Sequence, residues 1–165
     1  MDYHPTVKQI IDILNTNNCW YETFTHLPVT TSEEAAKTRP GYTLEQGAKA
    51  LIVKIEKRSK DVEFCMLVLP AHLKLDSKKV KSALDIKNLR FASEDEILTI
   101  THGVQRGAIP PFGNLFGIKV YVDPLLFNNE KIVFNAGDRR FSIAMKSEDY
   151  RKIVKPELLN MRESS

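Results

Sequence analysis

The sequence has few of the residues on which disulfide, metal and membrane chemistry depend. Its two cysteines, Cys19 and Cys65, lie in apolar stretches, and neither has a second cysteine at metal-ligand spacing, which disfavours a zinc site. Two buried free thiols are a simpler interpretation than a disulfide. No apolar run is long enough to span a membrane. The polar, helix-like N-terminus differs from a signal peptide, so we expect a cytoplasmic protein without a membrane partner.

Common catalytic and nucleotide-binding motifs are missing as well. The 7 glycines do not form a phosphate-binding loop of the Walker type or a dinucleotide-binding fingerprint. No histidine pair has the spacing of a zinc peptidase. Ser142, Asp138 and His102 have the residue types of a catalytic triad. The chain lacks, however, the Gly-x-Ser-x-Gly elbow that usually presents the nucleophile. These absences argue against triad, zinc and nucleotide chemistry, and we expect neither a metal ion nor a cofactor.

The overall composition is that of an ordinary globular protein. With 165 residues, of which 42% are hydrophobic and 27% charged, the chain is predicted to form one domain over residues 1–165, with its core at about 4–153. The net charge of +3 permits a nucleic-acid partner without requiring one. The positive charges gather near residues 54–60, 74–81 and 139–155. Such clusters are usually solvated faces, but three of them in one small domain favour a phosphate-rich ligand.

Apolar periodicity, capping residues and turn residues predict a mixed α/β fold. We expect helices at 5–17, from Thr31 to before Pro40, from Asp76 or Ser77 to about 84, at 93–100, and from a Ser147 cap to before Pro156. We expect strands at 20–25, 50–55, 62–69, 118–122, 131–134 and 140–145, with a tight turn at Gly137-Asp138. Residues 161–165 are expected to be disordered. Two hairpins interrupt the alternation of strands and helices, which favours a mixed sheet surrounded by helices.

The stretch from Gly103 to Gly117 fits neither a helix nor a strand. It contains four glycines and the adjacent Pro110 and Pro111, which predict a stiff loop because glycine permits positive φ and proline fixes φ. Free amide groups at residues 107–109 would form a concave site for an anion or a carbonyl oxygen. From composition alone, this segment is either such a site or a long connection without chemistry.

Several single residues also have two interpretations. Lys49 precedes an apolar strand, where it is either a solvated side chain or a fixed cation at the mouth of a pocket. His26 is either a packed loop residue or a base. Arg139 and Arg140 either follow a simple turn or hold a phosphate backbone. Pattern alone does not decide between these alternatives.

Taken in order, several segments resemble the YbaK/prolyl-tRNA-synthetase-associated editing family. They are Gly-Ala-Lys-Ala-Leu-Ile-Val at 47–53, Leu-Pro at 69–70, Leu-Asp-Ser-Lys-Lys-Val at 75–80, Gly-Ala-Ile-Pro-Pro-Phe-Gly at 107–113, Phe-Asn-Ala-Gly-Asp-Arg-Arg at 134–140 and Ser-Ile at 142–143. The resemblance implies a mixed, partly barrel-like sheet with helices outside. It also implies a free-standing enzyme that hydrolyses the ester between a wrong amino acid and tRNA, with mischarged aminoacyl-tRNA as substrate and an aminoacyl-tRNA synthetase as a further partner.

The resemblance also suggests a role for individual residues. The family's single lysine falls on Lys49 and its Gly-x-x-x-Pro loop on residues 107–111, so we assign catalysis to Lys49, Gly107, Ala108 and Ile109. We assign substrate binding to Pro111, Ser142, His26, Thr31 and Ala50, and tRNA binding to Arg139, Arg140, Lys78 and Lys79. Ala50 replaces a threonine and Ser142 an acidic residue found in some relatives, which bears on whether the substrate is alanyl, seryl, threonyl or cysteinyl-tRNA.

Two other functions are consistent with the sequence. The chain is either the proposed deacylase or a non-catalytic module of the same fold that binds tRNA or a synthetase. An unrelated small-molecule hydrolase would cleave simple esters without tRNA. Hydrolysis of a panel of aminoacyl-tRNAs separates the three functions.

Overall fold

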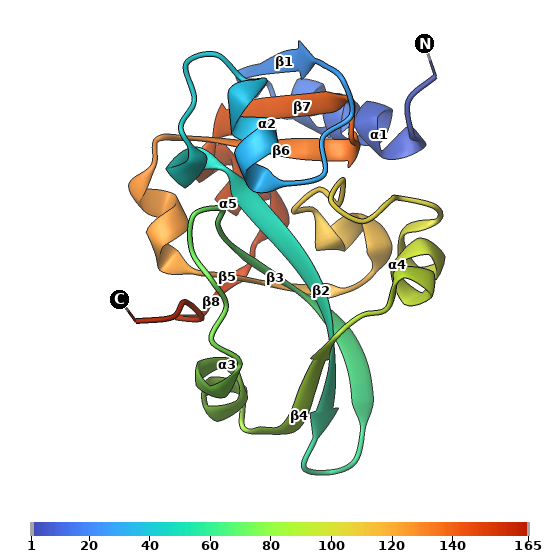
Figure 1. Ribbon diagram of the computed structural model, residues 1–165, viewed down its shortest axis with the longest axis vertical. Coiled ribbons are helices and arrows are strands. Elements are labelled where there is room, and N and C mark those ends of the chain that lie inside the picture. Colours follow the sequence, from blue (N-terminus) through green and yellow to red (C-terminus); the bar gives the residue numbers. More distant parts are fainter. Residues whose placement is uncertain (1, 165) are drawn as a thin grey trace.

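The computed structural model describes residues 2–164 as one α/β domain (Figure 1). Its α-helices are α1 (Pro5–Thr16), α2 (Ser32–Lys37), α3 (Ser77–Leu84), α4 (Glu94–Thr101) and α5 (Ser147–Val154). Short 3-10 helices lie at η1 (Leu44–Gln46), η2 (Gly113–Phe116) and η3 (Pro124–Asn128). In the part of the chain that the structure covers, no helix is both long enough and apolar enough to cross a membrane.

The strands form two sheets. The three-stranded sheet has the order β1 (Tyr21–Thr25), β7 (Phe141–Lys146), β6 (Lys131–Asp138), and all its strands are antiparallel. The five-stranded sheet has the order β4 (Ile86–Phe91), β2 (Ala48–Lys57), β3 (Val62–Pro70), β5 (Lys119–Val122), β8 (Glu157–Leu158). Its β4–β2–β3 part is antiparallel, whereas β5 and β8 add in parallel. The predicted mixed sheet is therefore confirmed.

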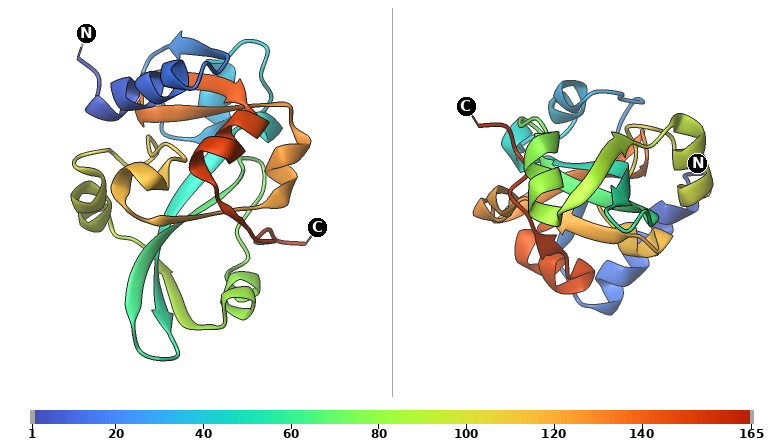
Figure 2. Two further views of the ribbon diagram at one scale, coloured as in Figure 1. Left: turned by 180° about the vertical axis from the view of Figure 1, so that it is seen from behind. Right: turned by 90° about the horizontal axis from the view of Figure 1, so that it is seen from below.

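One bridge connects the two sheets at the start of β2. Gly47 pairs with Val133 in the parallel direction, so β2 leaves the three-stranded sheet beside β6 and continues into the five-stranded sheet. Within residues 2–164 the sheets stay open and form no closed barrel. In Figure 1, α2 covers the front of β6 and β7, whereas Figure 2 shows α1 and α5 on the back of the same sheet.

Local signals account for most helix boundaries. Pro5 occupies the first turn of α1, and the His4 side chain accepts from the Thr6 amide. Asp76 caps α3 by accepting from the amides of Lys78 and Lys79. Ser93 opens α4 with a capping box, in which its side chain accepts from the Glu96 amide.

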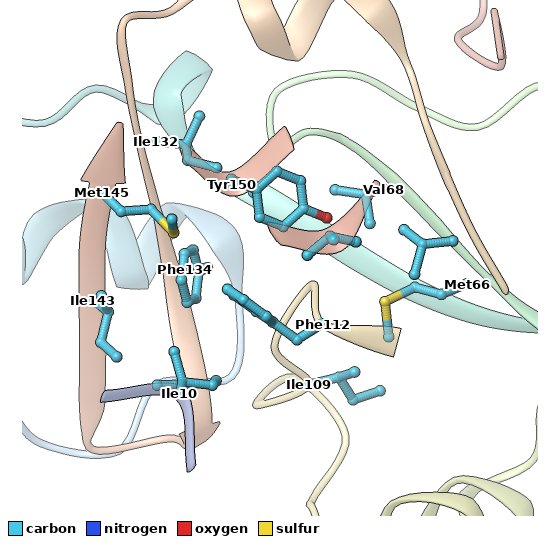
Figure 3. Packing of buried hydrophobic residues seen from close by; sticks show 14 of the residues in the cluster. Ile10, Met66, Val68, Ile109, Phe112, Ile132, Phe134, Ile143, Met145 and Tyr150 are labelled. Carbon is cyan, nitrogen blue, oxygen red and sulfur yellow. The ribbon is translucent and has the colours of Figure 1, made fainter. Parts of the chain in front are cut away.

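Aromatic packing holds the glycine–proline segment onto the core. Phe112 is fully buried, with its ring centroid 5.5 Å from those of Phe134 and Tyr150. Figure 3 shows Phe112 between Phe134 on β6 and Tyr150 on α5, with Ile109 beside it. The segment is therefore part of the core on one side, which fixes the loop that precedes it.

Two predicted boundaries are wrong. The turn between β6 and β7 lies at Arg139 and Arg140, because a bulge between Asn135 and Asp138 keeps Gly137 within β6. Lys146, not Ser147, is the N-cap of α5, and the Ser147 hydroxyl donates to Asn129 O instead.

The end of the chain also differs from the prediction of disorder. Residues 161–164 are ordered because Met161 N and Arg162 Nη1 donate to the buried carboxylate of Asp123, at 3.0 and 2.7 Å. Met161 itself is fully buried. Ser165, the last residue of the predicted disordered tail, lies outside the described residues.

Candidate functional site

A pocket of about 420 Å³ lies between α2, β2, β6 and the loop at residues 105–109. Small side chains of α2, among them Ala35 and Ala36, form one side of it. The start of β2, from Gly47 to Ile52, forms another, because β2 passes from one sheet to the other at this point. The pocket therefore occupies the junction of the two sheets, where segments distant in the sequence meet.

The glycine-containing loop forms a further wall of the pocket, beside the residue that precedes the N-cap of α2. Gly107 has a φ of +88°, which disfavours any side chain, and a Cβ added there would make van der Waals contact with Thr30 O at 3.4 Å. Gly107 O accepts a hydrogen bond from Asn135 Nδ2 at 2.8 Å. The carbonyl of buried Pro111 accepts from Tyr150 Oη at 2.6 Å. The prediction of a stiff loop beside a pocket is consistent with this geometry.

Not every predicted amide of this loop is available to a ligand. The Ala108 amide donates to Gln105 O, and Ala108 O accepts from the Gly137 amide, so the assignment of Ala108 as an amide donor is wrong. The amides of Gly107 and Ile109 have no hydrogen-bond partner within residues 2–164, and both residues line the pocket. Two N–H groups, not three, are free to bind an oxyanion or a carbonyl oxygen.

Lys49 also lines the pocket, from the first part of β2. Its ammonium is half-buried and donates to Leu73 O at 2.6 Å, which leaves two of its three N–H groups without a partner among the described residues. Burial lowers the pKa of Lys49, and the charge of Glu33 opposes that change. Lys49 thus provides a partly desolvated positive charge at the pocket.

A buried arginine, which sequence reasoning missed, forms the inner wall. Arg39 follows α2 and lines the pocket, with only 6% of its surface exposed. Its Nε donates to Ser142 Oγ and its Nη2 to Asn135 Oδ1, each at 3.0 Å. Within residues 2–164 it forms no ion pair. Desolvation lowers the pKa of Arg39 to about 10, so it stays protonated at neutral pH.

The Ser142 hydroxyl, fully buried, connects Arg39 to His26. His26 Nδ1 lies 2.9 Å from Leu27 O, which only accepts, so this nitrogen carries a proton. His26 Nε2 lies 2.9 Å from Ser142 Oγ, and Asn135 Oδ1 lies 3.1 Å from the same oxygen. The Ser142 hydroxyl therefore contacts three side chains, those of Arg39, His26 and Asn135. His26 and Ser142 support the pocket from behind, because neither lines it.

The other predicted residues divide into two groups. Thr31 and Ala50 line the pocket, whereas Pro111 lies buried behind the loop. Arg139 lines the pocket mouth, where its Nε donates to Arg106 O at 2.9 Å, and Arg140 forms an ion pair with Asp138.

Lys78 and Lys79 lie on α3, which Figure 1 places at the opposite end of the molecule from α2. Lys78 is exposed, but the Lys79 ammonium donates to Arg162 O and Ser164 Oγ. Residues 2–164 contain no group of three or more histidine, cysteine, aspartate or glutamate side chains that could hold a metal ion.

The chain is similar to several known proteins. The profile of the family "aminoacyl-tRNA editing domain" matches residues 26–153. The chain is 33% identical over 161 residues to the multifunctional Ser/Thr-tRNA deacylase ProXp-y of Escherichia coli K12, covering 97% of this chain and 95% of that protein. It is 25% identical over 148 residues to a proline–tRNA ligase of Ralstonia pickettii, covering 85% of this chain but 24% of the ligase.

A solved structure has the same fold. It is described as a candidate trans-editing enzyme for prolyl-tRNA synthetase, and it superposes with a TM-score of 0.80 at 18% identity, covering 99% of this chain and all of that one. The chain therefore belongs to the aminoacyl-tRNA editing domain family, and the prediction of an aminoacyl-tRNA deacylase is confirmed at the level of the family.

Proposed function

We propose that this protein hydrolyses the ester between a small amino acid and the 3′ end of tRNA, acting as a free-standing editing enzyme. The observation that carries the proposal is the pairing of the free Gly107 and Ile109 amides with the Lys49 ammonium around one pocket. Serine and threonine are favoured among the alanyl, seryl, threonyl and cysteinyl candidates, because the E. coli relative carries Ser/Thr-tRNA deacylase in its name.

An aminoacyl ester is reactive enough that positioning and charge stabilisation suffice for its hydrolysis. Water attacks the ester carbonyl carbon, and the negative charge that develops on the carbonyl oxygen is stabilised by the Gly107 and Ile109 amides. The bond to the ribose oxygen then breaks and releases the free amino acid and the tRNA 3′ hydroxyl. A neighbouring ribose hydroxyl assists proton transfer, since the pocket presents no nucleophilic triad.

Lys49 binds the terminal phosphate or the ester carbonyl with its two free N–H groups. Arg106 and Arg139 lie at the pocket mouth and contact the phosphates of the acceptor end, so binding weakens as the salt concentration rises.

Arg140, Lys78 and Lys79 are the remaining predicted tRNA contacts. Lys79 fits this role less well than Lys78 because its ammonium is bound to the C-terminal segment.

An aminoacyl-tRNA synthetase is a further partner, which the similarity to part of a prolyl-tRNA ligase supports. We also propose a cytoplasmic location, because the proposed substrate is tRNA.

The test is deacylation of alanyl-, seryl-, threonyl- and cysteinyl-tRNA by the wild-type protein and by Lys49→Ala. We expect the variant to lose about 100-fold or more in rate, because one preorganised charge or donor contributes about 2–4 kcal/mol in the transition state. Lys54→Ala is the matched control, because Lys54 lies on the same strand over the Phe64 ring and does not line the pocket. Full activity of a folded Lys49→Ala variant would exclude Lys49 from catalysis.

The second candidate, a binding module without activity, predicts tRNA binding without ester loss above the spontaneous rate. Cleavage of simple esters at the same rate as aminoacyl-tRNA would instead favour a small-molecule hydrolase.

A further inference from the structure

The buried guanidinium of Arg39 has more donors than the protein uses. An arginine carries five N–H groups, and Arg39 gives one to Ser142 Oγ through Nε and one to Asn135 Oδ1 through Nη2. Its Nη1 has no protein partner. Yet every fully buried side-chain nitrogen and oxygen within residues 2–164 is hydrogen-bonded. Nη1 is therefore not fully enclosed, and since Arg39 lines the pocket, these donors open into it.

The surroundings of Arg39 determine what can meet these donors. The α-ammonium of an esterified amino acid is repelled by Arg39 and by Lys49, so it must point away from both. If the Gly107 and Ile109 amides hold the ester, as proposed above, the group that reaches Arg39 is the amino-acid side chain. The α2 side chains that line the same pocket, Ala35 and Ala36, are small and leave room for an amino-acid side chain.

The side-chain group that meets these donors must carry an oxygen acceptor, and among the small amino acids proposed above that oxygen is the hydroxyl of serine or threonine. Both oxygens that already accept from Arg39 are neutral, a hydroxyl and an amide carbonyl, so the protein solvates this cation with dipoles and not with a counter-charge. The same Asn135 that accepts from Arg39 donates to Gly107 O at 2.8 Å. Asn135 thus links the guanidinium of Arg39 to the loop that would bind the ester, and it fixes the position of one relative to the other.

We infer that Arg39 donates to a hydroxyl oxygen on the side chain of the esterified amino acid and makes the pocket selective for hydroxyl-bearing amino acids. The inference rests on the proposed function and adds to it the residue that distinguishes seryl from alanyl esters. An alanyl or cysteinyl side chain leaves the Arg39 donors without an oxygen acceptor, and an unpaired buried donor costs binding free energy.

The test measures binding, so that it does not depend on hydrolysis. The probes are adenosines that carry serine or alanine at the 3′ position through an amide, which resists hydrolysis. We expect the wild-type protein to bind the seryl probe about 10- to 100-fold more tightly than the alanyl probe, the effect of one satisfied buried donor. In Arg39→Met the ratio of the two dissociation constants should fall to about one, while affinity for the alanyl probe changes little.

Lys37→Met is the matched control, because it removes one positive charge from α2 at an exposed position outside the pocket, and it should keep the wild-type ratio. If Arg39→Met does not fold, Arg39→Lys gives the same information, because it keeps the charge but not the fork of donors, and it should lower the ratio. Thermal unfolding of each variant shows whether it is folded.

Three results would overturn the inference. One is equal binding of both probes by the wild-type protein. Another is an equal loss of affinity for both probes in the folded Arg39 variant, which would place Arg39 at the ester or the ribose. A third is tighter binding of an aspartyl probe than of the seryl probe, which would make the site one for carboxylates. If the wild-type protein prefers the seryl probe but does not hydrolyse seryl-tRNA, the inference stands and the proposed function fails.

Discussion

The two walls of the pocket are built in different ways. The loop wall offers backbone amides of Gly107 and Ile109, held by buried prolines and by Tyr150. The other wall offers side chains, with Arg39 bound to Ser142 and Asn135. A backbone wall tolerates changes of side chain as long as φ and space permit, so it suits a step that is the same for every ester. A side-chain wall changes with single substitutions, so it suits the choice of amino acid.

The largest effect should come from Gly107→Ala, which alters the backbone wall. The positive φ disfavours a Cβ here, so the backbone should shift and the amides should turn away from the ester. Loss of an aligned oxyanion donor lowers the deacylation rate by about 100- to 1000-fold, measured as initial rates on all four aminoacyl-tRNAs.

Gly41→Ala is the control for this variant, because Gly41 has the same φ of +88° with open space around it and does not line the pocket. It should lose only a little stability and no activity. If Gly107→Ala changed the preference among amino acids and not the rate on all of them, the division of roles between the two walls would be wrong.

A pH profile tests the charge on Lys49, which lies between the walls. Burial lowers the pKa of Lys49, so the protonated form is lost at a lower pH than for an exposed lysine. We expect the enzymatic rate, corrected for spontaneous hydrolysis, to fall about tenfold per pH unit above that pKa. Lys49→Arg should move the fall to higher pH. The same shift makes the folded state gain stability as pH rises from the lowered pKa towards the ordinary one, because the unfolded chain then binds more protons.

Ser142→Ala tests the side-chain wall. It removes the oxygen that accepts from Arg39 Nε and contacts His26 Nε2, which leaves a buried donor unpaired. The free energy of unfolding should drop by about 1–3 kcal/mol, measured by urea denaturation, and the preference for seryl over alanyl esters should weaken. Ser82→Ala, at an exposed position on α3, should change neither quantity. A Ser142→Ala variant with unchanged preference would show that Arg39 is held in place without this serine.

The smallest effect is expected from Tyr150→Phe, which removes the donor to Pro111 O. The buried carbonyl loses its only hydrogen bond within residues 2–164, at a cost of about 1–2 kcal/mol of stability, with an equal and modest fall in rate on every aminoacyl-tRNA. Tyr21→Phe removes an exposed hydrogen bond to Asn15 and should cost less. A rate loss restricted to one amino acid would mean that the loop also takes part in selection.

The backbone wall was predictable from sequence because its signals are local. Closely spaced glycines and prolines predict a stiff loop, and the lysine before an apolar strand belongs to a recognisable segment. The same is true of the β2–β3 hairpin and of the caps at Asp76 and Ser93, which each depend on a few neighbouring residues.

The side-chain wall was not predictable in this way. Arg39 lies 103 positions from Ser142 and 96 from Asn135, and nothing near it in the sequence distinguishes a buried guanidinium from an exposed one. It is buried because the segment after α2 brings it against Ser142 on β7 and Asn135 on β6. Strand β4 was missed because Ile86 is its only fully buried residue, so its sequence lacks the apolar alternation of a typical strand.

Asp123 makes the folded state depend on the last residues of the chain. Its carboxylate is fully buried and receives hydrogen bonds from Leu125 N, Met161 N and Arg162 Nη1. A polypeptide that stops before Met161 would bury the same negative charge with a single donor. Such a shortened product would unfold readily and be degraded. Premature termination late in translation would therefore leave little truncated protein in the cell.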